Sequence, residues 1–215
     1  MHKTSMVGLV AAAVVGALVD RLSTTTTIRR LRRQNSTLAD QARSDHLTGI
    51  LNRNGLGDVY AATNDRGRFL IVVDLDTFKS VNDEHGHPAG DQVLSTLGAR
   101  LAELASRHRG WAGRLGGDEF ALVLPNCTEA AALMAAAHAA ATIVTDSRTG
   151  AVHVRGSAGI AYAAATTSWS HALTEADIAL YHAKQRGTVT LFEPGMTYPT
   201  TPSPRRQARD IQTTN

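Results

Sequence analysis

A short acidic turn, Arg114–Phe120 (RLGGDEF), constrains this chain more than any other feature. Apolar runs with strand character flank it on both sides. Gly116 and Gly117 predict a tight hairpin, because only glycine adopts positive φ at both turn positions without steric cost. Asp118 and Glu119 then lie at or just beyond the turn, and neighbouring carboxylates repel unless a cation or a proton relieves them. A lone acidic turn is more often a solvated one, so a metal site here needs support from elsewhere in the chain.

That support comes from a second acidic turn upstream. Residues 69–73 (FLIVV) form a bounded apolar run, which is typical of a buried strand, and Asp74 lies at its mouth. Residues 77–79 then offer consecutive backbone N–H groups in a turn. A carboxylate beside such a nest suits a metal-bound triphosphate, with oxygen ligands for Mg²⁺ and N–H donors for phosphate. If the strand pairs with the hairpin, three carboxylates meet at one sheet edge in a one- or two-metal phosphoryl-transfer site.

The distribution of charge argues against a nucleic-acid partner, although the sequence pI is about 9.3. Residues 45–192 carry twelve Lys and Arg against fifteen Asp and Glu, a net charge of −3, whereas residues 1–44 carry seven against two. A protein that binds the phosphate backbone concentrates positive charge on its folded domain, and this one does not. The basic ends also lack the interleaved aromatic residues of single-strand binders.

The first part of the chain contains an uncharged run at 6–19 (MVGLVAAAVVGALV). As a helix it would be about 21 Å long against the roughly 30 Å of a bilayer core, which is short for a span. We expect a membrane anchor over residues 1–22; a cleaved export signal and a buried helix are the alternatives. One Lys precedes the run and five Arg follow it closely. This asymmetry predicts a single pass through the cytoplasmic membrane with the rest of the chain in the cytoplasm, the alternative being a cytoplasmic protein.

Residues 23–44 predict a short helical linker. Apolar or small residues, with one Asn, recur at alternating spacings of three and four, as in two heptads: Ile28, Leu31, Asn35, Leu38 and Ala42. Two heptads are fewer than a stable coiled coil needs. A short dimeric helix and a solvated amphipathic linker are therefore both consistent with the pattern.

The globular domain is predicted to begin at Asp45 and to end near Phe192. Helices alternate with strands, and the one hairpin interrupts the alternation: a helix to about 64, a strand at 69–73, a helix at 90–107, the hairpin at 111–124, a helix at 129–144, a strand region at 152–162, a helix at 173–186 and a strand at 189–192. This order predicts an α/β (α+β) sandwich of the ferredoxin-like type, with helices on a central, mainly antiparallel sheet. Residues 193–215, rich in Pro, Thr, Ser and Arg, predict a disordered tail.

Four motifs, in a fixed order and spacing over about 45–192, resemble those of the GGDEF family of diguanylate cyclases. They are Asp45-His46-Leu47-Thr48-Gly49; Asp74 to Asp83, running on to Gly86-His87 and Gly90-Asp91; Arg114 to Phe120; and Ala176-Asp177 to Ala183-Lys184. Any one alone would be weak evidence, whereas four in order are highly specific.

The resemblance implies a palm-like domain related to nucleotidyl cyclases. It implies that two protomers each hold one GTP and that each 3′-hydroxyl attacks the α-phosphate of the other GTP. The products are then cyclic di-GMP and two pyrophosphates, and a homodimer is required for activity. The alternative is a catalytically weak or inactive GGDEF module that binds GTP or cyclic di-GMP, or only dimerises.

The resemblance also assigns roles to residues of this chain. It implies Mg²⁺, with Mn²⁺ possible as a substitute, bound by Asp74, the backbone carbonyl of Leu75, Asp118 and Glu119. Either Asp118 or Glu119 would help to deprotonate the 3′-hydroxyl. The remaining residues would bind GTP: Asn82, Asp91 and Leu94 around guanine, Gly116 and Gly117 in close backbone approach, and Lys184 at the terminal phosphates. The N–H groups of the turn after the first strand place Phe78 and Lys79 near the phosphates as well.

Two positions depart from the family pattern. Thr188 stands where an Arg often helps to hold the phosphates, which predicts weaker GTP affinity. Many family members carry an inhibitory Arg-x-x-Asp motif that binds the product. This chain has its Arg, Arg107, but Gly110 replaces its Asp, which predicts no product inhibition through that site.

His85 and His87 are interpreted as solvated loop residues, because no third ligand lies at metal-binding spacing. Arg114 is expected to pair with Asp45.

Overall fold

The computed structural model describes residues 43–63, 67–125, 127–147 and 150–198. The predicted anchor, nearly all of the predicted linker and the chain beyond residue 198 lie outside these ranges, so the predictions made for them stay predictions. Within the described ranges, no helix combines the length and the apolar character that a bilayer span requires.

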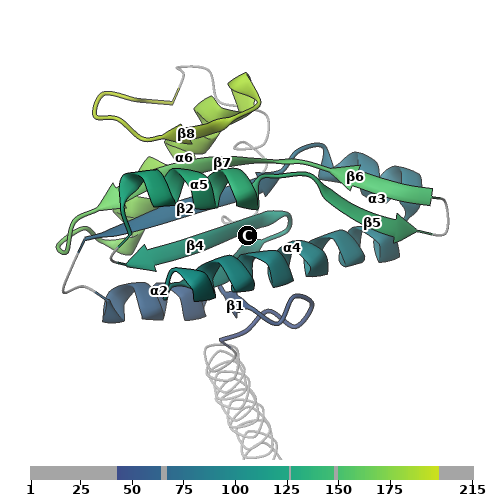
Figure 1. The fold of residues 1–215 in the computed structure, drawn as a ribbon, viewed down its shortest axis with the longest axis horizontal. Helices are drawn as coiled ribbons and strands as arrows, with labels where there is room; N and C mark the ends of the chain where they lie inside the picture. Colours follow the sequence, from purple (N-terminus) through teal and green to yellow (C-terminus); the bar gives the residue numbers. More distant parts are fainter. Residues whose placement is uncertain (1–42, 64–66, 126, 148–149, 199–215) are drawn as a thin grey trace, which may run out of the picture. The chain divides into compact units, whose positions relative to one another are not determined.

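A six-stranded sheet forms the centre of the domain (Figure 1). Its strands, in the order in which they lie side by side, are β1 (Leu51–Asn52), β3 (Trp111–Gly116), β4 (Glu119–Pro125), β2 (Arg68–Leu75), β7 (Gly156–Ala163) and β8 (Val189–Leu191). The four inner strands pair antiparallel, and the two edge strands pair parallel to their neighbours. The predicted mainly antiparallel sheet flanked by helices is therefore confirmed.

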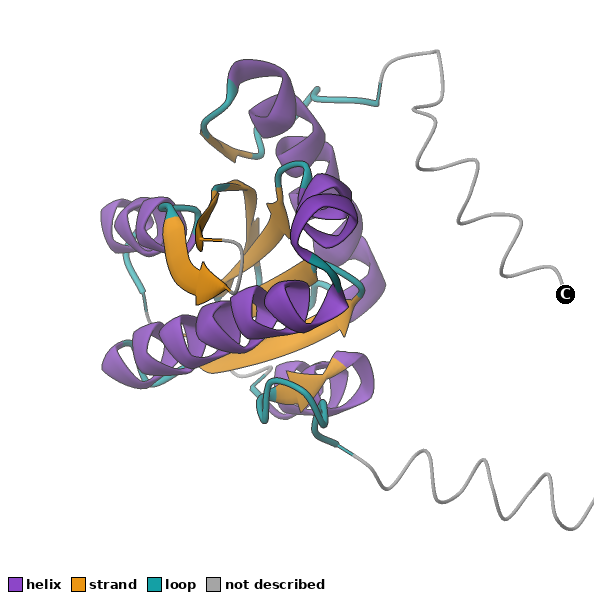
Figure 2. Cartoon of the chain, turned by 90° about the vertical axis from the view of Figure 1, so that its right-hand side faces the viewer, coloured by secondary structure: helices purple, strands orange, loops and turns teal. Residues whose placement is uncertain are grey.

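Helices cover both faces of this sheet, and Figure 2 shows them around the strands. They are α2 (Arg53–Ala62), α3 (Phe78–His85), α4 (His87–Arg107), α5 (Glu129–Ala139) and α6 (Trp169–Arg186). Alternate residues of β2 point to opposite faces, as the period of a strand requires. Phe69, Ile71 and Val73 pack with α3, α4 and α5, whereas Leu70 and Val72 pack with α2 and α6.

Short polar side chains fix where three helices begin. The Asn52 side chain accepts a hydrogen bond from the Gly55 N–H at the start of α2, and Thr128 and Ser168 cap α5 and α6 in the same way. Such caps satisfy N–H groups that have no partner within the helix. Helix α6 ends at Gly187, whose φ of 63° lies in the left-handed region that glycine tolerates.

Three predicted elements differ from the structure. Residues expected in a turn after β2 form helix α3. The helix predicted over 129–144 ends at Ala139, because the β-branched residues that follow favour a strand, β5 (Ile143–Ser147). The single strand region predicted at 152–162 is two strands: β6 (Gly150–Val154), which pairs with β5 in a separate two-stranded sheet, and β7.

The first residues of the predicted tail have a defined place in the structure. Residues 193–198 return to α6, where the Tyr198 hydroxyl donates to Asp177 and the carbonyl oxygen of Thr197 lies 3.2 Å from His182 Nε2. Disorder predicted from composition therefore does not apply to this short stretch, because side chains of α6 hold it.

Candidate functional site

The acidic turn is a hairpin whose two turn residues are Gly117 and Asp118. Gly116, expected in the turn, is the last residue of β3 and pairs with Glu119, and a bulge shifts the register just before it. The φ angles of Gly116 and Gly117 are 148° and 52°, and a Cβ on either would meet no protein atom within 4 Å. Glycine is therefore needed here for its backbone conformation. Crowding by other atoms of the chain is not the reason.

Arg114 links this turn to the start of the domain. Its Nε and one terminal nitrogen donate to the Gly117 carbonyl at 2.9 and 2.7 Å, and the other lies 3.2 Å from Asp45 Oδ1. The hydroxyl and N–H of Thr48 also donate to Asp45. Burial alone would raise the pKa of Asp45, but these hydrogen bonds and the Arg114 guanidinium outweigh it and lower that pKa. The expected pairing of Arg114 with Asp45 is confirmed.

Asp74 and Glu119 lie directly opposite each other on β2 and β4, so the strand does pair with the hairpin, which was the condition for the expected metal site. Paired residues point to the same face of a sheet, here the face covered by α2 and α6. Both carboxylates are buried, with 3% and 9% of their residue surface exposed. Lys184, on α6, places its Nζ 2.6 Å from Asp74 Oδ1. The side chain expected at terminal phosphates therefore contacts a predicted metal ligand.

The donor set suits a hard divalent cation, although no group of three His, Cys, Asp or Glu side chains is arranged for a metal in the part of the chain that the structure describes. Mg²⁺ commonly takes one or two carboxylates and completes its shell with water and substrate phosphates. Asp74 and Glu119 provide two buried carboxylates on one face, and the Lys184 ammonium already places a positive charge against one of them. Asp74 and Glu119, two of the four predicted metal ligands, thus suit a metal that arrives with a nucleotide, whereas Asp118 lines the cavity beside α3 and α4.

A cavity of about 400 Å³ opens beside the turn, between the hairpin and helices α3 and α4. Seven of its nine lining residues were predicted from the sequence: Phe78, Lys79, Asn82, Asp91, Leu94, Gly117 and Asp118. Phe78 and Leu94 are buried and form an apolar wall, while the polar residues lie at the rim. An apolar slot with an amide and carboxylates at its edge can hold a flat heterocycle and bond its polar edge.

Thr77 shapes the approach from β2 to this cavity. Its φ of 54° is left-handed, which is strained for a β-branched residue, and its side chain makes no capping hydrogen bond. The chain then turns into α3, so the N–H groups of Phe78 and Lys79 belong to the first helical turn. The N–H of Leu75 donates to the Asp118 carbonyl at 3.4 Å, which joins the end of β2 to the hairpin.

His87 and Arg114 complete the lining, and neither was predicted to bind substrate. His87 begins α4 and lies one helical turn before Asp91, which places both on the same side of the helix. That i, i+4 spacing is visible in the sequence. His85 and His87 were expected to be loop residues, but His85 ends α3 and His87 begins α4.

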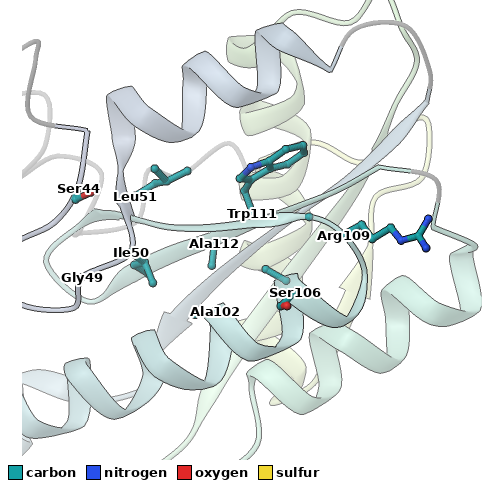
Figure 3. A pocket seen from close by; sticks show the side chains of 11 residues that line it. Ser44, Gly49, Ile50, Leu51, Ala102, Ser106, Arg109, Trp111 and Ala112 are labelled. Atoms are coloured by element: carbon teal, nitrogen blue, oxygen red, sulfur yellow. The ribbon is translucent and has the colours of Figure 1, made fainter.

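A second cavity of about 590 Å³ lies between the segment at 44–51, the end of α4 and the start of β3. Figure 3 shows Ile50, Leu51 and Trp111 around it, with the guanidinium of Arg109 directed away from the apolar side chains. Gly110, which stands where the inhibitory motif has Asp, is part of its lining. The expected loss of product inhibition is a prediction about this region.

Comparison with known proteins gives a family match over most of the domain. The model described as "Diguanylate cyclase, GGDEF domain" matches residues 42–190. The chain is 44% identical over 95 residues to the uncharacterised Bacillus subtilis protein YhcK, covering 41% of this chain and 26% of that one. It is 32% identical over 166 residues to diguanylate cyclase DgcM of Escherichia coli K12, covering 74% and 40%. The chain thus spans well under half the length of either relative.

Among solved structures, the chain is similar to the coiled coil and GGDEF domain of DgcB from Caulobacter crescentus, determined in complex with c-di-GMP. The TM-score is 0.65 at 26% sequence identity, and the match covers 81% of this chain and 98% of that one. The likeness therefore extends over almost the whole of that solved chain.

Proposed function

Because this chain belongs to the GGDEF family of diguanylate cyclases, we propose that it condenses two GTP molecules into cyclic di-GMP and two pyrophosphates. One observation supports this more than any other. Asp118 lines the same cavity as Asn82 and Asp91, so a carboxylate suited to phosphoryl transfer lies within one nucleotide's reach of an amide and a carboxylate suited to a base.

Different residues of the chain contact different parts of the nucleotide. The Asn82 amide and the Asp91 carboxylate bind the polar edge of guanine, which presents two kinds of N–H donor and one carbonyl acceptor. Leu94 and Phe78 contact the base face, and His87 closes the rim. Backbone N–H groups at Phe78 and Lys79, at the start of α3, donate to phosphate oxygens. Gly116 and Gly117 allow close approach of the triphosphate.

The reaction forms a bond between the 3′-oxygen of one GTP and the α-phosphorus of the other. It breaks the bond from that phosphorus to the oxygen bridging to the β-phosphate, and the electron pair leaves with pyrophosphate. Asp118 or Glu119 accepts the proton of the 3′-hydroxyl. A second attack in the opposite direction closes the ring. Each protomer supplies half of the reacting geometry, so we propose that a homodimer is the active form.

Lys184 and Asp74 supply the electrostatics at the phosphate end. Asp74, the Leu75 carbonyl, Asp118 and Glu119 would hold a divalent metal, Mg²⁺ or Mn²⁺. When bound, this metal would neutralise phosphate charge and polarise the α-phosphate. Lys184, already at Asp74, would then release that carboxylate and contact the terminal phosphates as a point charge. Thr188 offers no positive charge there, so GTP affinity is expected to be low for this family.

The alternative function is binding of GTP or cyclic di-GMP without turnover, with signalling by contact. Thr188 in place of Arg is the observation that favours it.

We also propose that residues 6–19 tether the protein to the cytoplasmic membrane with the domain in the cytoplasm. Fractionation of cells that express the full chain tests this, because recovery of the protein in the soluble fraction would rule out a membrane anchor.

The decisive assay incubates the full-length chain with GTP and Mg²⁺ and separates the nucleotides by chromatography. We expect cyclic di-GMP and pyrophosphate in a 1:2 ratio, with a rate per protomer that rises with protein concentration if a dimer is required. Saturable GTP binding without product would favour the alternative. Absence of GTP binding at high protein concentration would rule out both the cyclase and the binding function.

A further inference from the structure

Gly90 is buried inside α4, next to the proposed base-binding residues, and its backbone does not need glycine. It is absent from the residues with left-handed φ among those that the structure describes. Glycine is also the least favourable residue in a helix interior apart from proline. Neither local conformation nor helix propensity explains it, so the explanation lies in what surrounds it.

The space beside Gly90 is filled by Asn82. A Cβ built at position 90 would lie 2.0 Å from Asn82 Oδ1 and 3.0 Å from its Cγ, and 3.1 Å from Phe78 Cζ. These distances are far below ordinary van der Waals contact, and the conclusion holds whichever way the Asn82 amide is flipped. The amide of Asn82 therefore lies against the α4 backbone because position 90 has no side chain.

The backbone cannot easily relieve such a contact. Helices α3 and α4 are joined through Gly86 alone, whose N–H donates to the Asn82 carbonyl at 3.0 Å and whose carbonyl accepts from Gly90 at 3.3 Å. The two helices are thus tied together within one turn of both residues. A methyl group at position 90 would instead displace the side chain of Asn82, which has rotamers available toward the cavity.

We propose that Gly90 is a specificity-determining positioning residue, which seats the Asn82 amide at the angle from which it bonds guanine together with Asp91. The inference rests on the proposed function, because it takes the cavity as the guanine site. It assigns discrimination between guanine and adenine to a residue that contacts no nucleotide atom itself.

The test measures equilibrium binding to the full-length chain with Mg²⁺, using 3′-deoxy-GTP and 3′-deoxy-ATP, which cannot react because they lack the attacking hydroxyl. The variants are G90A, N82A and G90A/N82A. G57A is the matched control, since a Cβ there meets only Trp169 at 3.6 Å or more and adds the same helix propensity on α2. Thermal unfolding of each variant is recorded in parallel.

We expect G90A to weaken 3′-deoxy-GTP binding by about tenfold, the equivalent of one or two hydrogen bonds, and to leave 3′-deoxy-ATP binding unchanged. The double variant should bind no more weakly than N82A, and G57A should bind as the wild type does. Wild-type affinity for 3′-deoxy-GTP in G90A would overturn the proposal. So would additive losses in the double variant, because Gly90 would then act independently of Asn82.

If G90A unfolds, the unfolding temperatures decide the question. Removing the Asn82 side chain removes the nearest obstacle, so G90A/N82A should unfold at a higher temperature than G90A; equal instability of both would overturn the proposal. A wild-type chain that binds neither analogue would contradict the proposed function. The comparison of unfolding temperatures would still decide whether Gly90 makes room for Asn82.

Discussion

The ammonium of Lys184 lies 2.6 Å from Asp74 Oδ1, so a residue near the end of α6 neutralises a carboxylate at the end of β2. The Asp74 side chain is almost fully buried, whereas a quarter of the Lys184 side chain is exposed. Loss of the cation leaves a buried negative charge facing Glu119. Lys184→Met should therefore lower the free energy of unfolding by about 1–3 kcal/mol, less than for a fully buried pair because solvent screens the lysine.

Urea unfolding in the presence of a chelator measures this effect without metal. Arg186→Met is the control, since Arg186 is exposed on the same helix. Equal stabilities of the two variants would show that the contact contributes nothing. The double variant with Asp74→Asn should recover most of the loss, because the buried negative charge is then gone.

Asp118 should be essential for turnover and nearly irrelevant to stability. It occupies a turn position at the rim of the cavity, and substitutions at such places usually change stability by less than about 0.5 kcal/mol. Asp118→Asn should reduce cyclic di-GMP formation by about 100-fold or more, as expected when a charge that acts in the transition state is lost. Product is quantified by chromatography, with Glu129→Gln, an exposed acid on α5, as the control. Retained turnover with Asn would exclude Asp118 from the chemistry.

Asp45 should make the domain sensitive to acid. Its pKa in the folded protein is lower than the ordinary value of 3.8, so its contribution to stability is fully present above that value. The contribution is lost as the pH falls through the lowered pKa. The difference in unfolding free energy between wild type and Asp45→Asn should be constant from pH 7 to about pH 5 and shrink below pH 3.8.

Urea unfolding across this pH range gives the measurement. Asp58→Asn is the control, because Asp58 pairs with Arg43 at 2.8 Å where both side chains are more than half exposed. If the difference in unfolding free energy between wild type and Asp45→Asn stays constant down to about pH 3, Asp45 has the same pKa in the folded and unfolded states, and the prediction is wrong.

Two left-handed residues near the turn should respond in opposite directions to substitution. Gly117→Ala introduces a Cβ at φ 52°, in open space, so the expected cost is the conformational one, about 1 kcal/mol. Thr77→Gly relieves a strained φ of 54° and should leave stability unchanged or raise it by up to about 1 kcal/mol. Thermal unfolding distinguishes the two. A destabilised Thr77→Gly would show that the Thr77 side chain contributes more than its strain costs.

Asp74 and the acidic hairpin could be placed from the sequence, because they lie at strand ends that the hydrophobic pattern reveals. The candidate residues on α3, α4 and α6 do not lie at strand ends, and most of them came from the family resemblance. The apolar run before Asp74 and the glycine pair before Asp118 predicted the strand and the hairpin, and the structure shows that the two pair. The same pattern could not predict that Asp74 and Glu119 share a face while Asp118 lines a cavity beside the other layer. That depends on register, in which one residue changes the face of a side chain.

Two other features depended on tertiary structure. The contact between Lys184 and Asp74 joins residues far apart in the chain, and only the docking of α6 on the sheet brings them together. Helix α3 was missed because its first residues were interpreted as a turn that donates N–H groups. A helix start also offers N–H donors, so the expected contact with phosphate stays a prediction although the local structure is a helix start and not a turn.

The cavity wall made by α3 and α4 is one unbroken piece of chain, Phe78–Leu94, whereas the buried carboxylates lie on two neighbouring strands, β2 and β4, and face α6, which carries Lys184. The proposed base-binding residues and the buried carboxylates therefore lie on separate parts of the chain. Transplanting residues 82–94 from a homologue should transfer the choice of base while leaving the buried carboxylates and Lys184 in place. A change of chemistry would need coordinated substitutions across the whole sheet.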